Sequence, residues 1–201
     1  KCVWSGGKSP TIGFVAAGKN WLDLIHSMSL LGLDKDEANR FGVSLYKVGQ
    51  IWPLDTDSFD VWAKNLDLII VIEEKRKILE GQIKETIFDK RDGKRIYGGK
   101  KNGLELFSSK FALDPVEIAQ KIGDILIEEG CGSEKIVSNL NLIAQSRKTE
   151  NTSEIVSRIP YFCSGCPHKT STKIPEGSRA YAGIGCHYMA QWMDRDTLGY
   201  T

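Results

Sequence analysis

The sequence predicts an α/β protein with an open, mostly parallel β-sheet covered by helices on both faces. Two observations support this fold class. Short apolar segments, typical of buried strands, alternate along the chain with longer segments whose apolar residues recur every three or four positions, as in amphipathic helices. One strand segment, 66–72, is almost uniformly apolar, which is typical of a strand buried on both faces of a parallel sheet.

The first strand and helix are predicted from an apolar run and a change of period. Residues 11–17 form the apolar run, and Gly18 follows it. Asn20 is expected to cap a helix that ends at Gly32, because asparagine is a favoured N-cap residue and glycine often follows a helix. The apolar positions of this helix are Trp21, Leu22, Leu24, Ile25, Met28 and Leu31.

The next elements repeat the alternation. Asp34 is expected to cap a short helix that runs through Arg40. Pro53 ends the extended segment that follows, because proline cannot donate a backbone hydrogen bond. The predicted elements between Arg40 and residue 88 are a strand over 43–48, a helix over 57–64, the strand over 66–72 and a helix over 74–88.

The segment 89–110 is polar and rich in turn pairs, so we expect a surface loop or β-excursion around the short extended stretch 95–97. Asp114 and Pro115 then predict the start of a helix that Gly130 ends. The predicted organisation has a first α/β domain over 1–132 and a second domain that begins at 158 and continues to 201. A helical connector and linker over 133–157 joins them. Its helix is predicted at 133–146 and its polar linker at 147–157.

Composition excludes some classes of partner. The formal net charge is +1, and the longest basic runs, at 75–77 and 100–101, are short, so we expect no nucleic-acid partner. No apolar run is long enough to span a bilayer and no leader precedes the first strand, so we expect no membrane partner. An odd number of cysteines that includes a Cys-x-x-Cys pair suits a reducing compartment, and we expect a cytoplasmic protein.

Three of the five cysteines gather near the C-terminal end. Cys163 and Cys166 form a Cys-x-x-Cys pair, and Cys186 stands in a glycine-rich loop. Thiols at this spacing can turn toward one metal centre. Two centres fit: a structural zinc site completed by His168 or His187, or an iron-sulfur cluster whose fourth ligand comes from elsewhere. Ordinary buried thiols are the least favoured interpretation, because Pro167 and the glycines make a poor core element.

The words around these cysteines resemble one family. They are FCSGCPH at 162–168 and GIGCH at 183–187. Together with TIGFVAAGK at 11–19, QIWPLD at 50–55 and IIVIEE at 69–74, they resemble the indolepyruvate:ferredoxin oxidoreductases in their fused bacterial form, which are thiamine-diphosphate-dependent 2-oxoacid:ferredoxin oxidoreductases. The resemblance covers nearly the whole chain. It implies a transketolase C-terminal-like first domain, followed by the start of a thiamine-diphosphate-binding α/β domain.

The resemblance also implies an activity. The full enzyme would oxidatively decarboxylate indolepyruvate or another arylpyruvate to the acyl-CoA, and pass electrons through [4Fe-4S] centres to ferredoxin. The implied cofactors are thiamine diphosphate, Mg²⁺ and a [4Fe-4S] cluster, with coenzyme A as co-substrate and a homo-oligomer as the working form. We expect an internal fragment that is inactive alone, because the family's Gly-Asp-Gly motif is absent and Gly123-Asp124 falls within a helical pattern.

Carried onto this sequence, the family pattern makes Cys163, Cys166 and Cys186 ligands of the cluster. It places His168, Gly185 and His187 against the coenzyme, and it assigns no catalytic residue. The two histidines have a second interpretation, in which they donate hydrogen bonds to the thiolates without touching substrate. The rival function for the whole chain is a zinc-stabilised α/β binding or scaffold module without catalysis.

Overall fold

The computed structural model describes residues 1–90, 93–150 and 159–193. The chain divides into two compact units, Lys1–Thr149 and Glu150–Thr201. The first unit holds the α/β sheet, and the described part of the second contains short helical segments joined by loops. The predicted domain boundaries at 132 and 157 stay a prediction.

The main sheet of the first unit has five strands in the order β1-β3-β2-β4-β5. The strands are β1 (Cys2–Trp4), β2 (Ile12–Ala17), β3 (Val43–Val48), β4 (Leu68–Ile72) and β5 (Arg95–Tyr97). Strands β2 to β5 are parallel, and β1 joins the β3 edge in the antiparallel direction. The central strand β2 places Val15 opposite Tyr46 on one side and Val71 on the other. The predicted open, mostly parallel sheet is therefore confirmed.

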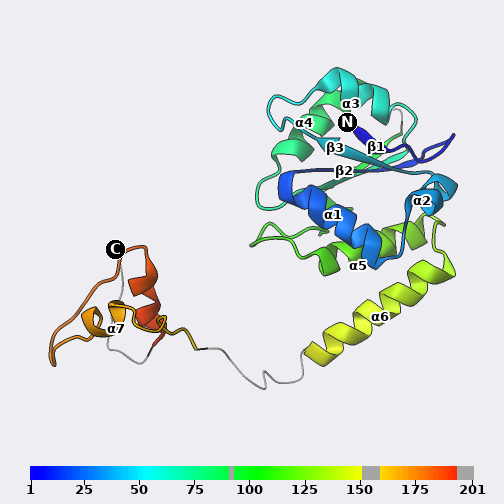
Figure 1. The fold of residues 1–201 in the computed structure, drawn as a ribbon. Coiled ribbons are helices and arrows are strands. Elements are labelled where there is room, and N and C mark those ends of the chain that lie inside the picture. The colour runs from blue at the N-terminus through cyan, green and yellow to red at the C-terminus, as the bar shows by residue number, and fades with distance from the viewer. Residues whose placement is uncertain (91–92, 151–158, 194–201) are drawn as a thin grey trace. The chain divides into compact units, whose positions relative to one another are not determined.

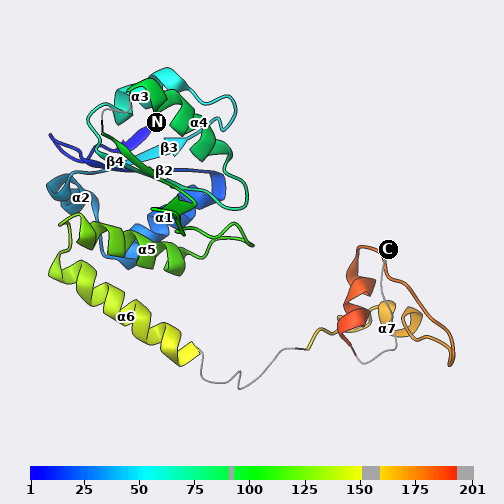
Figure 2. The same ribbon diagram turned by 180° about the vertical axis from the view of Figure 1, so that it is seen from behind.

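Helices cover both faces of this sheet. One face carries α1 (Gly18–Leu30), α2 (Lys35–Phe41) and α5 (Pro115–Glu128), and the other carries α3 (Thr56–Ala63) and α4 (Ile78–Ile87). Figures 1 and 2 show α1 and α5 on one side of the strands and α3 and α4 on the other. The long helix α6 (Glu134–Glu150) follows α5. Along the described residues, no helix combines the length and the apolar character needed to cross a membrane.

Alternate residues of the central strand feed two separate core layers. Phe14 faces the layer beneath α1 and α5, and Val15 faces the layer beneath α3 and α4. Both side chains are fully buried. Burying a side chain of this size stabilises the fold by about 1.5–3 kcal/mol, so a strand that is buried on both faces carries much of the stability of the unit.

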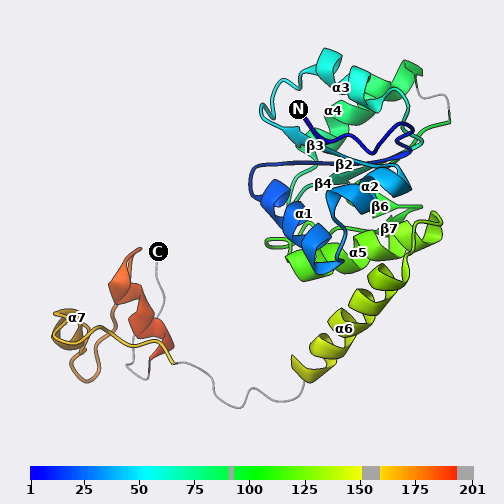
Figure 3. The same ribbon diagram turned by 45° about the vertical axis from the view of Figure 1, so that its right-hand side comes forward.

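The shorter segments lie outside the main sheet. A small antiparallel hairpin is formed by β6 (Lys100–Lys101) and β7 (Leu104–Glu105), and Figure 3 shows it beside α5. A single turn, η1 (Phe88–Lys90), follows α4. In the second unit the described elements are α7 (His168–Ser171) and η2 (Cys186–Trp192).

Two of the predicted helix caps are confirmed. The Asp34 carboxylate accepts hydrogen bonds from the backbone N–H groups of Asp36 and Glu37 at 3.0 and 2.9 Å, and α2 begins directly after it. Asp114 accepts from Val116 N–H at 3.0 Å, with Pro115 at the first position of α5. Each cap satisfies N–H groups that have no partner inside their own helix.

The predicted Asn20 cap is wrong. Helix α1 begins at Gly18, and Ala17 stands at the N-cap position without a side-chain cap. The Asn20 amide instead donates to the carboxylates of Asp23 and Glu74, at 3.5 and 3.4 Å. Gly18 adopts a positive φ of 52°, which lets the chain turn from strand to helix without an intervening loop.

The start of α4 also differs from its prediction. The helix begins at Ile78 and not at Glu74, because Lys75 adopts a positive φ of 61° that interrupts a helical path. The Glu73 carboxylate reaches forward and accepts from Leu79 N–H at 2.8 Å and from Glu80 N–H at 3.2 Å. This acid therefore serves the helix N-terminus from outside the helix.

Two strands depart from the prediction. Strand β1 is not among the predicted elements. Residues 95–97, expected within a surface excursion, form the edge strand β5 of the main sheet. The pairing partner of 95–97 is Leu68–Ile70, far away in sequence. The predicted linker at 147–157 begins too early, because α6 continues to Glu150, and residues 151–157 lie outside the described part of the chain.

The first testable prediction concerns the ion pair that ties β5 to the end of α5. Both guanidinium NH₂ groups of Arg95 donate to the Glu129 carboxylate at 2.7 Å, and this bond holds the pKa of Glu129 below its ordinary value of 4.5. The stabilisation is present above pH 4.5 and is lost as the pH falls through the lowered pKa. We expect Glu129→Gln to reduce the free energy of unfolding near neutral pH by roughly 1 kcal/mol or less.

Urea denaturation over a pH series checks this prediction. The difference between Glu129→Gln and the unchanged protein should disappear at acidic pH, where both side chains are neutral. Glu85→Gln, at an exposed position of α4, is the matched control for the loss of a carboxylate. A difference that stayed constant across the series would contradict the assignment.

The second prediction concerns the packing against β2. A Cβ added at Gly13 would meet Leu66 Cδ1 and lie 2.7 Å from Cη2 of Trp62, so Gly13→Ala forces the core apart. We expect it to lower the free energy of unfolding by about 1–3 kcal/mol. Gly81→Ala in α4 is the control, because no atom lies within 4 Å of the added Cβ there. The control should raise stability by up to about 1 kcal/mol. Equal effects of the two substitutions in chemical denaturation would refute this packing.

Candidate functional site

The cysteine-bearing tail begins with a tight turn. Cys166 N–H donates to the Cys163 carbonyl at 3.1 Å, and Gly165 inside the turn adopts a positive φ of 73°. Glycine reaches this conformation without strain, whereas other residues do so at a steric cost. The turn therefore explains why the two cysteines are separated by a Ser-Gly pair, and it keeps both thiols on one short loop.

The same loop leads directly into a histidine. Pro167, with φ of −60°, precedes α7, and His168 is the first residue of that helix. Its Nδ1 atom lies 3.2 Å from Cys166 Sγ, within hydrogen-bonding range for sulfur. The His168 ring also packs near two others, with centroids 5.5 Å from the buried Phe162 and 5.9 Å from His187.

His187 brings in the second cysteine segment. It follows Cys186 at the start of η2, and Gly185 precedes them both. A Cβ added at Gly185 would lie 2.9 Å from His187 Cε1 and 3.0 Å from its Nδ1, so the glycine makes room for the imidazole. The structure thus brings together Cys166, His168, Gly185 and His187 from the two words of the motif.

A complete metal site is not assembled. Among residues 1–90, 93–150 and 159–193, the structure contains no group of three or more His, Cys, Asp or Glu side chains that could hold a metal ion. Cys163 and Cys186 are exposed, Cys166 is half-buried, and all five cysteines are free thiols. The predicted ligand set therefore stays a prediction. Three cysteine thiolates are the right type of donor for three of the four ligand positions of an iron-sulfur cluster.

The other two cysteines have structural surroundings of their own. Cys2 Sγ lies 3.2 Å from the Trp4 carbonyl oxygen and 3.9 Å from Ser44 Oγ, beside the edge of the sheet. Cys131 is buried within the core beneath α1 and α5, and its burial raises the pKa of the thiol. A raised pKa disfavours the thiolate that a metal requires, so Cys131 serves packing.

The carboxyl edge of the parallel sheet is the usual ligand position in open α/β folds. A cavity of about 370 Å³ lies there, lined in part by Ala17, Asn20 and Arg76. Burial raises the pKa of Glu73, yet its carboxylate already accepts from the N-terminus of α4. Glu74 accepts from Asn20 and from Leu113 N–H at 3.2 Å. Both acids thus have structural partners, and we assign no chemistry to this cavity.

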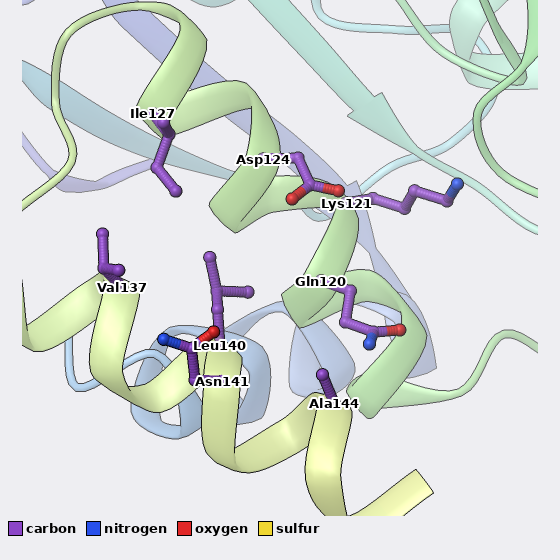
Figure 4. Close-up of a pocket in the computed structure, with 8 residues that line it drawn as sticks. All are labelled: Gln120, Lys121, Asp124, Ile127, Val137, Leu140, Asn141 and Ala144. Atoms are coloured by element: carbon purple, nitrogen blue, oxygen red, sulfur yellow. The ribbon is translucent and has the colours of Figure 1, made fainter. Parts of the chain in front are cut away.

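A second cavity, of about 420 Å³, lies between α5 and α6 (Figure 4). The residues that line it are Gln120, Lys121, Asp124, Ile127, Val137, Leu140, Asn141 and Ala144. Gly123 allows the close approach of the two helices, since a Cβ there would lie 2.7 Å from Leu140 Cδ2. The lining contains no cysteine or histidine, and this cavity is a gap in the packing of α5 against α6.

The chain matches known proteins along most of its length. A family model described as the indolepyruvate oxidoreductase domain matches residues 1–150. The indolepyruvate oxidoreductase subunit IorA of Thermococcus kodakarensis is 25% identical over 191 residues, which cover 92% of this chain and 26% of that protein. The IorA subunit of Pyrococcus abyssi is 23% identical over 167 residues, covering 83% of this chain and 23% of the relative. The chain therefore spans about a quarter of the length of these curated relatives.

Solved structures resemble the chain more distantly. A 2-oxoglutarate:ferredoxin oxidoreductase from Magnetococcus marinus aligns with a TM-score of 0.40 at 17% identity, over 62% of this chain and 19% of that one. A split-gene transketolase aligns with a TM-score of 0.37 at 11% identity, over 69% and 40%. The family model, in contrast, spans 150 of the 201 residues, and the chain belongs to the indolepyruvate oxidoreductase domain family.

Proposed function

We propose that this chain is part of a 2-oxoacid:ferredoxin oxidoreductase that decarboxylates indolepyruvate or another arylpyruvate to the acyl-CoA and passes the electrons to ferredoxin. The family match carries the proposal. The T. kodakarensis relative extends it into the tail, because its match leaves only 8% of this chain outside. Cys163 and Cys166 lie further than that from either end, so the match includes them.

The tail would supply part of a redox centre. Cys163, Cys166 and Cys186 would hold a [4Fe-4S] cluster, and its fourth thiolate would come from a segment outside this sequence. The glycine-supported turn at Cys163 and Cys166 supports this role, because it places two thiols on one short loop. The exposed thiols of Cys163 and Cys186 can reach a cluster without first leaving a packed core.

Thiamine diphosphate, when bound, would supply the electron sink that permits loss of CO₂ from a 2-oxoacid. His168, Gly185 and His187 are the residues of this chain that would lie against it. Gly123-Asp124 belongs to helix α5, so it is not the motif that binds the diphosphate and Mg²⁺. That motif would come from outside this sequence. The tail would then be the beginning of a thiamine-diphosphate-binding domain. The first α/β domain would serve as a scaffold.

The partners follow from the same proposal. Ferredoxin would accept the electrons, coenzyme A would accept the acyl group, and the full-length protein would act as a cytoplasmic homo-oligomer. The names of the relatives support the substrate class, since the proteins from T. kodakarensis and P. abyssi are both indolepyruvate oxidoreductase subunits. The chain alone would be inactive.

The third prediction tests the redox centre directly. In the full-length protein purified without oxygen, Cys163→Ser, Cys166→Ser and Cys186→Ser should each remove about four iron atoms and four acid-labile sulfides per chain. A serine hydroxyl is a much poorer ligand for iron than a thiolate. Cys2→Ser, at an exposed thiol of the first unit, is the matched control and should leave both contents unchanged.

Metal and sulfide analysis separates this proposal from its rival. Stoichiometric zinc without labile sulfide, lost in the same three variants, would establish a zinc-stabilised module and overturn the oxidoreductase centre. Iron and sulfide contents that none of the three substitutions alters would remove these cysteines from the ligand set.

A further inference from the structure

The contact between Cys166 and His168 lies within a single short segment of the tail. Cys166 Sγ and His168 Nδ1 are 3.2 Å apart, and only Pro167 separates the two residues. Both side chains are half-buried. The contact is therefore local in sequence, and it involves a thiol of the proposed ligand set.

The imidazole is held from several sides. The backbone carbonyl of His168 accepts hydrogen bonds from Thr172 N–H at 3.2 Å and from the Thr172 hydroxyl Oγ1 at 2.5 Å, and these bonds fix the first turn of α7. The proline before it has a restricted φ, so the chain enters that turn in one direction. The rings of Phe162 and His187 flank the imidazole at 5.5 and 5.9 Å.

We infer that His168 donates a hydrogen bond through Nδ1 to the metal-bound Cys166 thiolate, and that this bond raises the reduction potential of the iron-sulfur centre. The inference rests on the proposed function, because it needs a redox-active centre at Cys166. His168 is accordingly a positioning and tuning residue, which acts through the thiolate and not on the substrate.

The direction of the hydrogen bond follows from which of the two atoms carries a hydrogen. A thiolate that binds metal has no proton and can only accept. Nδ1 must then carry the hydrogen, and in the neutral imidazole Nε2 is left as an acceptor. The contact thus fixes the tautomer of His168, as hydrogen bonds to ligand atoms commonly do beside metal centres.

The effect on the redox equilibrium follows from charge. When the centre gains one electron, negative charge on its sulfur ligands increases, and a donor aimed at a sulfur stabilises the reduced state more than the oxidised state. A hydrogen bond to a charged group is strong enough to shift this equilibrium by about tenfold. For a one-electron couple, tenfold corresponds to about 59 mV.

Two isosteric variants distinguish the two ring nitrogens. An asparagine amide nitrogen can occupy the position of Nδ1, whereas a glutamine amide nitrogen reaches the position of Nε2. His168→Asn therefore keeps the proposed donor, His168→Gln moves it, and His168→Phe removes it while retaining a ring against Phe162.

The fourth prediction is a shift of potential in the full-length holoenzyme. Dithionite would supply the electrons through mediator dyes, and electron paramagnetic resonance would follow the centre whose signal Cys166→Ser abolishes. His168→Phe and His168→Gln should lower the equilibrium constant for reduction about tenfold, or about 59 mV. His168→Asn should stay close to the unchanged protein. His26→Asn, at an exposed histidine of α1, is the control for loss of an imidazole.

The outcomes separate the inference from the proposed function. If all three His168 variants keep both iron and potential, or if glutamine and not asparagine preserves the potential, the Nδ1 bond is refuted while the cluster stands. If His168→Phe fails to fold, the comparison of asparagine with glutamine decides. If Cys166→Ser leaves every iron-sulfur signal intact, or zinc is found without sulfide, the proposed centre itself is refuted and the inference falls with it.

Discussion

Burial of the central strand on both faces is the constraint on which the first unit depends. Strand β2 has neighbours on both edges and a helical layer on each face, so Phe14 and Val15 are both excluded from water. Its backbone N–H and C=O groups can then be satisfied only by β3 and β4. The parallel ladder and the two core layers therefore stabilise each other, and a helix on either face is needed to keep the ladder dry.

This constraint also determines how acidic side chains are used at the carboxyl edge of the sheet. Chains that leave parallel strands must turn sharply into helices, and the new helix ends need partners. Glu73 accepts from the start of α4, and Glu74 joins Asn20 to the loop at Leu113. Acids at an edge where other α/β proteins bind ligands are here engaged in holding the connections together. Position alone would have suggested a binding site, whereas the hydrogen-bond partners give these two carboxylates a structural role.

Local signals made most of the fold predictable. Asp34 and the Asp114-Pro115 pair predicted their helix starts correctly, because a cap involves only residues two or three positions away. Two of the failures occurred where a distant partner decides. Arg95–Tyr97 becomes a strand by pairing with Leu68–Ile70. Asn20, a good cap in isolation, is drawn to the carboxylate of Glu74. In the tail, the contact of Cys166 with His168 lies within a motif of three residues, whereas the position of Cys186 relative to Cys163 is set by the twenty or so residues between them.

The described part of the tail buries few apolar side chains. Within 159–193, the buried apolar residues are Phe162, Ala182 and Ala190. These three side chains bury little apolar surface, and small units commonly depend on metals or on further chain for stability. A centre bound by thiolates supplies such a constraint, because its binding free energy is also folding free energy. Under the proposed function, metal binding would draw the thiols of the two cysteine loops together, and the contacts of His168 with Cys166 and with His187 are the part of the site that the polypeptide forms beforehand.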